Sequence, residues 1–247
     1  MSIDLAVIGG SGLYQFPGLG NPSRQAVDTP YGKASGDIVV GDFRGRRLAF
    51  LARHGESHDL PPHRVNYRAN VWALHSIGAS RVIGVNAVGG IRDDMGPRAV
   101  VVPDQLIDYT HGRLTSFCDV EGAEVRHIDF SDPYTPSLRK ALVAAAAAAG
   151  IDVVDGGCYG ATQGPRLETR AEIARMRRDG CDLVGMTGMP EAVLARELGL
   201  EYACLALVAN WAAGVVDEDE ISIEEIFAHL AAATAAVPAI LAGLVDS

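Results

Sequence analysis

Short apolar runs that end in turns of small or polar residues recur along the chain, and this pattern constrains the fold more than any other feature. Each run has the length and composition of a buried strand. The clearest are residues 5–8 before Gly9-Gly10-Ser11-Gly12, residues 81–85 before Asn86-Ala87-Val88-Gly89-Gly90, and residues 202–208 before Ala209-Asn210-Trp211. Helical patterns separate these strands. The alternation predicts an α/β fold with one mixed, mainly parallel sheet flanked by helices.

The remaining elements fill the chain without a linker or a repeat, so we expect a single domain over residues 1–247. Further strands are predicted at 37–41, 47–51, 100–102, 105–107, 153–159 and 183–184. Helices are predicted at 65–77, 136–149, 170–178, 190–198 and 222–244. The long polar connection at 111–127 has neither pattern, and we interpret it as a lid or a subunit-contact segment.

Composition narrows the classes of partner. With 48% hydrophobic residues the chain can bury a substantial core. The net charge of −10 disfavours nucleic acid and membrane surfaces as partners. No basic N-terminal segment precedes an apolar stretch and no run of 18 apolar residues occurs, so we expect no signal peptide, no membrane span and a cytoplasmic location. The four cysteines form no Cys-x-x-Cys pair, which predicts free thiols.

Polar groups follow several of the predicted strands, at the edge where α/β proteins place their ligands. Hydroxyls, an imidazole, a guanidinium and backbone amides together suit an inorganic phosphate or sulfate, and the planar fork of arginine matches two of its oxygens. Each residue alone has an ordinary interpretation as a turn, interior or capping residue, so the hypothesis depends on their recurrence. The residues are Ser11, Arg53, His54, Asn86, Ala87 and Asn210, with Thr187 from a later turn.

The stretch 164–191 places two turns of small residues on either side of one amphipathic helix. Its glycines allow backbone amides to approach a ligand closely. Pro190 blocks helix propagation upstream, and Glu191 is predicted in the first turn of the next helix. Thr187 comes just before that turn, where a hydroxyl and free N–H groups can surround an anion. We expect this stretch to form one wall of a small-molecule site.

Spacing argues against three other kinds of site. The first glycine turn lacks the Gly-x-Gly-x-x-Gly pattern and no clear helix follows before Pro17, which disfavours a dinucleotide cofactor. His54, His58 and His63 lack a helical i, i+4 spacing, which disfavours a metal site. No Gly-x-Ser-x-Gly elbow occurs, which disfavours a serine hydrolase.

Five motifs, in order along nearly the whole chain, resemble the purine nucleoside phosphorylase superfamily, and most closely its trimeric methylthioadenosine phosphorylase branch. They are Gly-Gly-Ser-Gly-Leu-Tyr at 9–14, Ala-Arg-His-Gly at 52–55, Val-Asn-Ala-Val-Gly-Gly at 85–90, Gln-Gly-Pro-Arg-Leu-Glu-Thr at 163–169 and Gly-Met-Thr-Gly-Met-Pro-Glu at 185–191. The resemblance implies phosphorolysis, in which phosphate attacks C1′ of a purine nucleoside and the base leaves. It implies phosphate as a co-substrate and no metal, cofactor or covalent nucleophile.

The resemblance also assigns residues to each part of the substrate. It implies that Met186 meets the sugar, that Leu167 takes the place of a phenylalanine on the purine face, and that Glu168 lies beside the base. It further implies a homotrimer in which a neighbour completes the 5′ pocket, with 111–127 as the candidate contact. The implied phosphate ligands are Ser11, Arg53, His54, Asn86, Ala87 and Thr187, with Asn86 in place of a hydroxyl residue common in that branch.

Two positions select the nucleoside. The 6-aminopurine enzymes of the branch carry an Asp-x-Asp after the last strand, whereas this chain has Asn210-Trp211-Ala212, and we expect these three residues to bind the substrate. The Asn210 amide can donate to O6 and accept from a protonated N7, so we expect it to be the catalytic group at a 6-oxopurine. Ile223 stands where ordinary purine nucleoside phosphorylases place a histidine for the 5′-hydroxyl, which favours an apolar 5′-methylthio group. With Glu168 as a further specificity residue, these positions predict 5′-methylthioinosine as the substrate.

Other functions stay open from the sequence. Methylthioadenosine or inosine and guanosine are the alternative substrates. A purine- or phosphate-binding module without turnover is the non-enzymatic alternative. A nucleosidase that uses water is the third, although it has no need for the residues predicted to hold phosphate.

Overall fold

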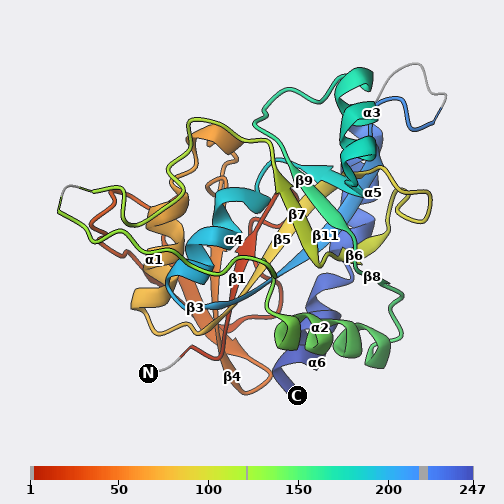
Figure 1. The fold of residues 1–247 in the computed structure, drawn as a ribbon. Helices are drawn as coiled ribbons and strands as arrows, with labels where there is room; N and C mark the ends of the chain where they lie inside the picture. Colours follow the sequence, from red (N-terminus) through yellow and green to blue (C-terminus); the bar gives the residue numbers. More distant parts are fainter. Residues whose placement is uncertain (1–2, 121, 217–221, 247) are drawn as a thin grey trace.

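The computed structural model describes residues 3–120, 122–216 and 222–246. The strands of this part of the chain form one twisted sheet through the middle of the molecule (Figure 1). They are β1 (Leu5–Gly9), β2 (Gly20–Gln25), β3 (Ile38–Phe43), β4 (Arg46–Ala52), β5 (Arg81–Gly90), β6 (Val100–Val102), β7 (Gln105–Asp108), β8 (Val154–Asp155), β9 (Cys158–Ala161), β10 (Leu183–Gly185) and β11 (Glu201–Trp211).

The centre of the sheet is parallel. β1 pairs with β4 and β5, and β5 pairs with β11, all in parallel. Antiparallel strands β3 and β2 extend one side, and β10 joins the end of β5 antiparallel. The predicted α/β class with a mixed, mainly parallel sheet is confirmed. Because β1, β4, β5 and β11 run the same way, their carboxyl ends meet at one edge of the sheet.

Helices cover both faces of the sheet (Figure 1). Alternate residues of β1 point to opposite faces: Leu5 and Val7 join one core cluster, whereas Ala6 and Ile8 join the other. The helices α1 and α4 pack on the Ala6 face, and α2, α5 and α6 pack on the Leu5 face. The helices are η1 (Pro62–Arg64), α1 (Tyr67–Ser76), α2 (Pro136–Ala148), α3 (Arg170–Asp179), α4 (Gly188–Glu197), α5 (Ile223–Thr234) and α6 (Val237–Asp246).

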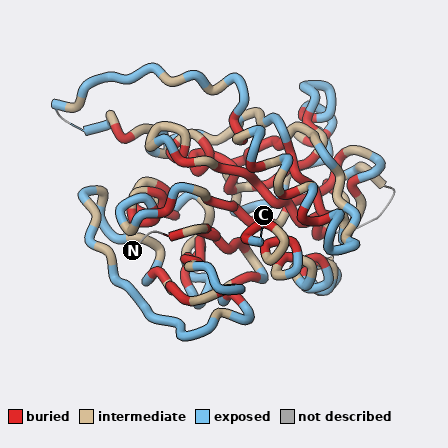
Figure 2. The backbone as a smooth tube through the Cα atoms, turned by 90° about the horizontal axis from the view of Figure 1, so that it is seen from below, coloured by how far each residue is buried: buried red, intermediate tan, exposed pale blue. Residues whose placement is uncertain are grey.

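Burial explains why the central strands read as continuous apolar runs. Figure 2 shows buried backbone through the middle of the molecule and exposed backbone in the peripheral loops. Strands with both faces covered have no solvent side, so polar alternation is absent. The predicted helix at 170–178 is confirmed as α3. Thr169 and Glu172 cap its N-terminus with reciprocal side-chain-to-backbone hydrogen bonds.

Two predicted turns are instead parts of strands, because β5 runs on through Gly90 and β11 runs on through Asn210 to Trp211. We expected the strand at 81–85 to end at Asn86, but β5 continues to Gly90. Gly89 and Gly90 pair with β10 on one side and with β11 on the other. A Cβ added at Gly90 would lie 1.7 Å from the carbonyl oxygen of Met95, so this glycine serves close packing.

Two predicted elements are each split in the structure, and one strand was not predicted. The strand expected at 153–159 is split into β8 and β9 by Gly156 and Gly157, whose φ angles are 96° and 127°. The helix expected at 222–244 is two helices, and Pro238, which lacks an N–H, lies in the first turn of α6. The exposed edge strand β2 was not predicted, because its sequence has no apolar alternation.

The segment Ile223–Asp246 is long and apolar enough to cross a membrane by length and composition alone. Core helices of water-soluble proteins meet the same criterion. Here α5 and α6 bury Leu230, Ile240, Leu241 and Leu244 within the core cluster on one face of the sheet. α6 packs as a core helix, whereas α5 buries Leu230 and Ala233 and leaves Ile223 and Phe227 exposed.

Candidate active site

A cavity of about 420 Å³ lies where β1, β4, β5 and β11 end. It is bordered by residues from both ends of the chain, including most of those predicted from the sequence. The predicted residues that border it are Ser11, Arg53, His54, Ala87, Leu167, Glu168, Met186, Thr187, Asn210, Ala212 and Ile223. Two predicted residues, Asn86 and Trp211, are not among its lining residues.

Thr187 and Ser11 bring hydroxyl groups to one end of the cavity. The Asn86 Nδ2 group donates to Thr187 Oγ1 at 2.8 Å, so the Thr187 hydroxyl proton remains available to a ligand. Met189 and Pro190 have non-helical dihedral angles, so regular helix begins at Glu191, close to the start predicted at Pro190. A Cβ added at Gly10, beside Ser11, would lie 2.6 Å from the Val85 carbonyl oxygen.

Asn86 takes a different place from the one expected. It is fully buried, and its Nδ2 group donates to Thr187. Its Oδ1 atom accepts hydrogen bonds from Arg53 Nη2 at 3.4 Å and from Cys204 Sγ at 3.6 Å. Asn86 therefore orients the Thr187 hydroxyl from behind the cavity wall.

Arg53 is fully buried and forms a bidentate ion pair with Glu191. Its Nε atom lies 2.7 Å from Glu191 Oε2, and its Nη2 atom lies 2.8 Å from Oε1. Nη1 donates to the Val85 carbonyl at 2.9 Å, and Tyr202 also donates to Glu191 at 2.8 Å. Burial alone would lower the pKa of Arg53, but the charge and hydrogen bonds of Glu191 raise it above its usual value. The guanidinium edge of Arg53 that we expected to bind phosphate is therefore paired with Glu191.

His54 is 5% exposed and has a fixed ring orientation. Its Nδ1 atom lies 2.8 Å from the Leu60 carbonyl oxygen. Its ring stacks on His58, with centroids 5.0 Å apart, and His58 Nδ1 lies 2.8 Å from the Tyr14 hydroxyl. Burial, followed by the charge of Arg53, lowers the pKa of His54 to about 4. The imidazole is therefore neutral at neutral pH.

Asn210 reaches the cavity at an irregularity in β11. The register of β11 against β5 shifts between Val208 and Asn210, as at a β-bulge, which redirects side chains. Asn210 Nδ2 donates to the Trp211 carbonyl at 2.6 Å. A carbonyl oxygen only accepts, so this contact fixes the orientation of the amide. Among the described residues, Oδ1 and the second N–H of Asn210 have no hydrogen-bond partner.

Glu168 and Leu167 border the same cavity as Asn210. Glu168 Oε1 accepts a hydrogen bond from the Thr162 hydroxyl at 2.6 Å, which holds the carboxylate in place. Leu167 is 42% exposed, so it covers the cavity mouth more than it fills the core. Together with Asn210 they form a polar and apolar end that suits a heterocyclic base.

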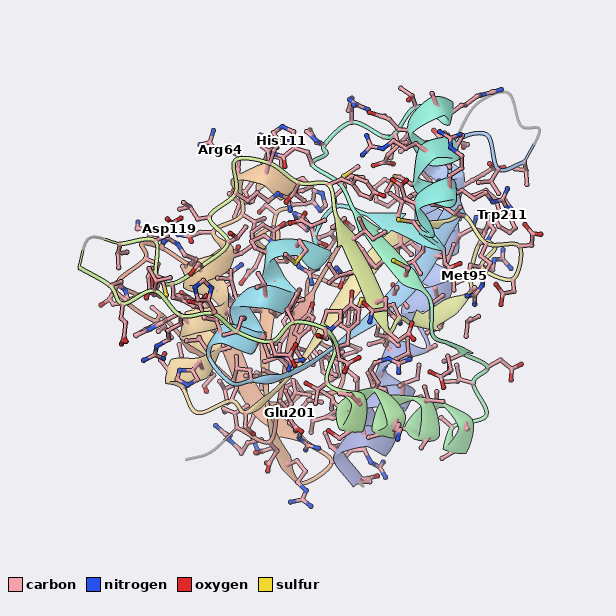
Figure 3. All side chains as sticks on the ribbon, in the orientation of Figure 1. Arg64, Met95, His111, Asp119, Glu201 and Trp211 are labelled. Carbon is pink, nitrogen blue, oxygen red and sulfur yellow. The ribbon has the colours of Figure 1, made fainter. Side chains whose placement is uncertain are left out.

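Trp211 lies away from the cavity. In Figure 3 it lies near Met95 at the right of the molecule. A Cβ added at Gly96 would lie 2.8 Å from the indole ring, so Trp211 packs over this glycine. Its link to the site is its carbonyl oxygen, which holds Asn210.

The first turns of α5 give the cavity an apolar wall. Ile223, Ile226, Phe227 and Leu230 all border it. Ile223 and Phe227 are 55% and 54% exposed, so this wall lies at the cavity mouth. No histidine borders the cavity from this helix.

Arg113 supports the turns beside the cavity, a role that the sequence did not predict. It comes from the long connection between β7 and α2, which passes over α1 and α4 (Figure 1). Nη1 donates to the carbonyl oxygens of Met186 at 2.8 Å and Met189 at 2.5 Å, and Nη2 donates to those of Gln163 at 2.9 Å and Thr162 at 3.2 Å. Arg113 thus joins the two turns that flank α3. Four carbonyl acceptors leave no side-chain pattern, so no sequence signal identifies it.

Within the described ranges, no group of three or more His, Cys, Asp or Glu side chains could hold a metal ion. His54 and His58 stack on each other, and His54 Nδ1 is used by a carbonyl. The four cysteines are free thiols.

The fold agrees with the comparisons with known proteins. The chain belongs to the phosphorylase superfamily, whose family model matches residues 4–245. It is 61% identical over 243 residues to a Xanthomonas campestris pv. campestris protein named probable S-methyl-5′-thioinosine phosphorylase, covering 98% of this chain and 97% of the relative. It is 47% identical over 216 residues to the 6-oxopurine nucleoside phosphorylase of Pyrococcus furiosus, covering 85% of this chain and 80% of that protein.

A solved structure has the same fold. It is a methylthioadenosine phosphorylase from an antarctic soil metagenomic library, with a TM-score of 0.91 and 37% sequence identity. The match covers 99% of this chain and 86% of that one.

Proposed function

We propose that this protein cleaves 5′-methylthioinosine with inorganic phosphate, giving hypoxanthine and 5-methylthioribose 1-phosphate. One observation carries the proposal: a single cavity is lined by groups that suit an anion, by groups that suit a purine base and by an apolar helix face, which we assign to an anion end, a base end and an apolar end. Ser11, His54 and Thr187 form the anion end, Glu168 and Asn210 form the base end, and α5 forms the apolar end. The relative from Xanthomonas campestris, with its printed name, supports the same substrate.

The chemistry follows from these three ends. As the C1′–N9 bond breaks, its electron pair leaves with the purine and the sugar becomes oxocarbenium-like. A phosphate dianion beside the sugar stabilises that positive charge, and one of its oxygens forms the new bond to C1′. The free N–H of Asn210 stabilises the departing purine anion at O6, and its Oδ1 atom accepts from N7 once the purine has taken up a proton there. Displacement by phosphate needs no covalent nucleophile, and we propose that no cofactor or metal takes part.

The base end favours a 6-oxopurine. Hypoxanthine presents an N1–H donor and an O6 acceptor, whereas adenine presents a bare N1 and an amino group. The carboxylate of Glu168, held by Thr162, can accept from N1–H but would face the lone pair of adenine N1. The free N–H of Asn210 can donate to O6. A buried mismatch costs about 1–3 kcal/mol, which corresponds to roughly 10- to 100-fold discrimination.

The apolar end favours a 5′-methylthio group over a 5′-hydroxyl. Ile223, Ile226 and Phe227 offer no hydrogen-bond partner for a hydroxyl. Each buried methylene-sized group contributes about 0.8 kcal/mol. A nucleoside with an apolar 5′ substituent should therefore be preferred over inosine.

We also propose a cytoplasmic homotrimer that binds neither nucleic acid nor membranes. Exposed apolar side chains support an assembly: Leu114, Val120 and Val125 on the connection 111–127, and Ile223 and Phe227 at the cavity mouth. The net charge of −10 argues against anionic polymers and surfaces. Light scattering coupled to size-exclusion chromatography tests the trimer, and a monomer at assay concentration would contradict it.

Phosphorolysis of four nucleosides tests the function. Methylthioinosine, methylthioadenosine, inosine and adenosine are each supplied with and without phosphate, and the released base is quantified. We expect release only with phosphate and the highest kcat/KM for methylthioinosine.

Each other outcome identifies a different function. Preference for methylthioadenosine would contradict the assignment of the base end, and preference for inosine would contradict that of the apolar end. Base release in phosphate-free buffer would indicate a nucleosidase. Nucleoside binding without turnover would indicate a binding module.

A further inference from the structure

The protonation state of His54 determines what kind of anion the cavity accepts. Its Nδ1 atom lies 2.8 Å from the Leu60 carbonyl oxygen. A carbonyl oxygen only accepts hydrogen bonds, so Nδ1 carries the ring proton. In the neutral ring, Nε2 then presents a lone pair. No described residue donates a hydrogen bond to Nε2, and the ring borders the cavity.

The surroundings of His54 keep a second proton off the ring. The residue is 5% exposed, and the guanidinium of Arg53 is its immediate chain neighbour. Burial and this positive charge lower the pKa of His54 to about 4. The ring of His58 stacks on that of His54, and its charge lowers the pKa of His54 further.

The other groups at this end of the cavity are hydrogen-bond donors. The Thr187 hydroxyl accepts from Asn86 and so donates to the cavity. Ser11 adds a hydroxyl, and Ala87 lies at the same end. Arg53 keeps one N–H on Nη1 beyond those used by Glu191 and by backbone carbonyls. His54 Nε2 is thus an acceptor placed among donors.

We propose that His54 makes this site selective for an oxyanion that carries a proton, such as HPO₄²⁻, over one that carries none, such as sulfate. The inference depends on the proposed function only in taking this end of the cavity as the phosphate site. The P–OH group donates to His54 Nε2, and the other oxygens accept from Ser11, Thr187 and the remaining donors. A sulfate oxygen in the same place would face a lone pair.

The same contact orients the nucleophile. With the P–OH held at His54, an unprotonated oxygen faces C1′ and forms the new C1′–O bond. The electron pair of the C1′–N9 bond leaves with the purine, which takes a proton from water. The P–OH proton stays on the phosphate, so the sugar phosphate is released as its monoprotonated ester. His54 accepts a hydrogen bond throughout and transfers no proton.

Competition between phosphate and sulfate tests the proposal. In the wild-type protein, the dissociation constant of sulfate, measured as competitive inhibition against phosphate, should exceed that of phosphate by about 10- to 100-fold. Arsenate, which carries a proton like phosphate, should compete well. In His54→Gln the side-chain amide can turn either its oxygen or its NH₂ group to the anion, so the sulfate-to-phosphate ratio should fall to near unity.

Thr187→Ala is the matched control. It removes a donor that both anions use, so binding of phosphate and sulfate should weaken by similar factors and the ratio should stay high. A wild-type protein that binds sulfate as tightly as phosphate would overturn the proposal. A His54→Gln variant that keeps the full ratio would overturn it as well.

A measurement without substitution covers the case in which His54→Gln does not fold. Nitrogen-15 shifts of the histidine side chains in the wild-type phosphate complex should show a protonated Nδ1 and a bare Nε2 for His54. A protonated Nε2 would overturn the proposal. If phosphate neither binds nor supports base release, the proposed function itself fails. If phosphorolysis occurs while sulfate competes as strongly as phosphate, only the role of His54 fails.

Discussion

The side chains at the cavity depend on a second set of residues that hold them. Glu191 holds Arg53, Asn86 holds Thr187, and a backbone carbonyl holds His54. A ligand therefore meets donors and acceptors whose directions are already set, which reduces the ordering needed on binding. Removing Glu191 would leave the buried charge of Arg53 unpaired, which would lower the free energy of unfolding by about 3–5 kcal/mol.

Asn210→Asp should move the base preference towards 6-aminopurines. A carboxylate accepts from the exocyclic amine of adenine and repels O6 of hypoxanthine. The ratio of kcat/KM for methylthioinosine to that for methylthioadenosine should fall by about 10- to 100-fold. Steady-state kinetics on both nucleosides measures the ratio. Asn210→Ala should lower both values without reversing the preference, and an unchanged ratio in Asn210→Asp would contradict the assignment.

His54 should make the protein less stable in acid. Its pKa is about 4 in the folded protein and 6.5 for the ordinary group, so between these values the unfolded chain binds a proton that the folded chain does not. The contribution is fully present above about pH 6.5 and is lost as the pH falls towards about 4. The loss is on the order of 3 kcal/mol.

Urea unfolding of the wild type and His54→Gln at several pH values measures this contribution. The free energy of unfolding of the wild type should fall more steeply with acidification, because glutamine does not titrate. Parallel curves for the two proteins would contradict the shifted pKa.

At the scale of elements, one long connection joins the turns around the cavity. The segment between β7 and α2 is fastened to α1 and α4: Arg68 donates to the Ser116 carbonyl, and Glu197 accepts from the Phe117 N–H. From this base, Arg113 reaches the turns at 162–163 and 186–189. The predicted role of this segment as a subunit contact is still a proposal, whereas its role inside the chain is visible.

Arg113→Ala should impair use of the nucleoside more than use of phosphate. It releases the Met186 and Gln163 carbonyls beside the sugar and base, but Thr187 is still held by Asn86. We expect kcat/KM for the nucleoside to fall by about 10- to 100-fold while the KM for phosphate changes little. Arg113→Lys should give an intermediate effect, because it keeps the charge and loses the fork.

Arg68→Ala is the matched control for Arg113. It removes contacts to the Ser116 and Asp119 carbonyls of the same connection but touches neither turn at the cavity. Its kinetic constants should stay near those of the wild type. Equal kinetic losses in Arg68→Ala and Arg113→Ala would indicate that Arg113 acts only through general stability.

The sequence predicted features that are local in the chain. The predicted strand β1 and the hairpin of β3 and β4 are confirmed. The apolar runs and turns that define them each span only a few neighbouring residues. It did not predict that β5 passes through Gly89 and Gly90, since this depends on β10 and β11. Likewise, Arg53 pairs with Glu191, which lies 138 positions away in the sequence. The sequence predicted which residue types line the cavity. It did not predict their hydrogen-bond partners, because these depend on tertiary contacts.

At the scale of the whole molecule, the cavity is lined by residues from near both ends of the chain. Ser11 follows β1, and Ile223 and Phe227 begin α5, with the central strands between them. A ligand that fills the cavity contacts elements distant in sequence. Its binding energy should therefore oppose global unfolding and not only local opening.

Phosphate and hypoxanthine together should raise the melting temperature. At about 100 times its dissociation constant a ligand stabilises the folded state by about 2.7 kcal/mol. For a chain of this size that corresponds to roughly 5–10 °C, which differential scanning calorimetry resolves. Thr187→Ala should show a smaller shift at the same concentrations. No shift in the wild type would contradict binding at this cavity.

The pairing of Arg53 with Glu191 has a consequence for how phosphate arrives. The ion pair cancels its own charge and His54 is neutral, so these three side chains give the phosphate end no net charge. The chain as a whole carries −10, so no long-range field draws a dianion inward. Capture then depends on short-range donors, which ions in solution screen very little. Added salt screens only the repulsion between the dianion and the net charge of −10, so phosphate uptake by this protein should not weaken as ionic strength rises.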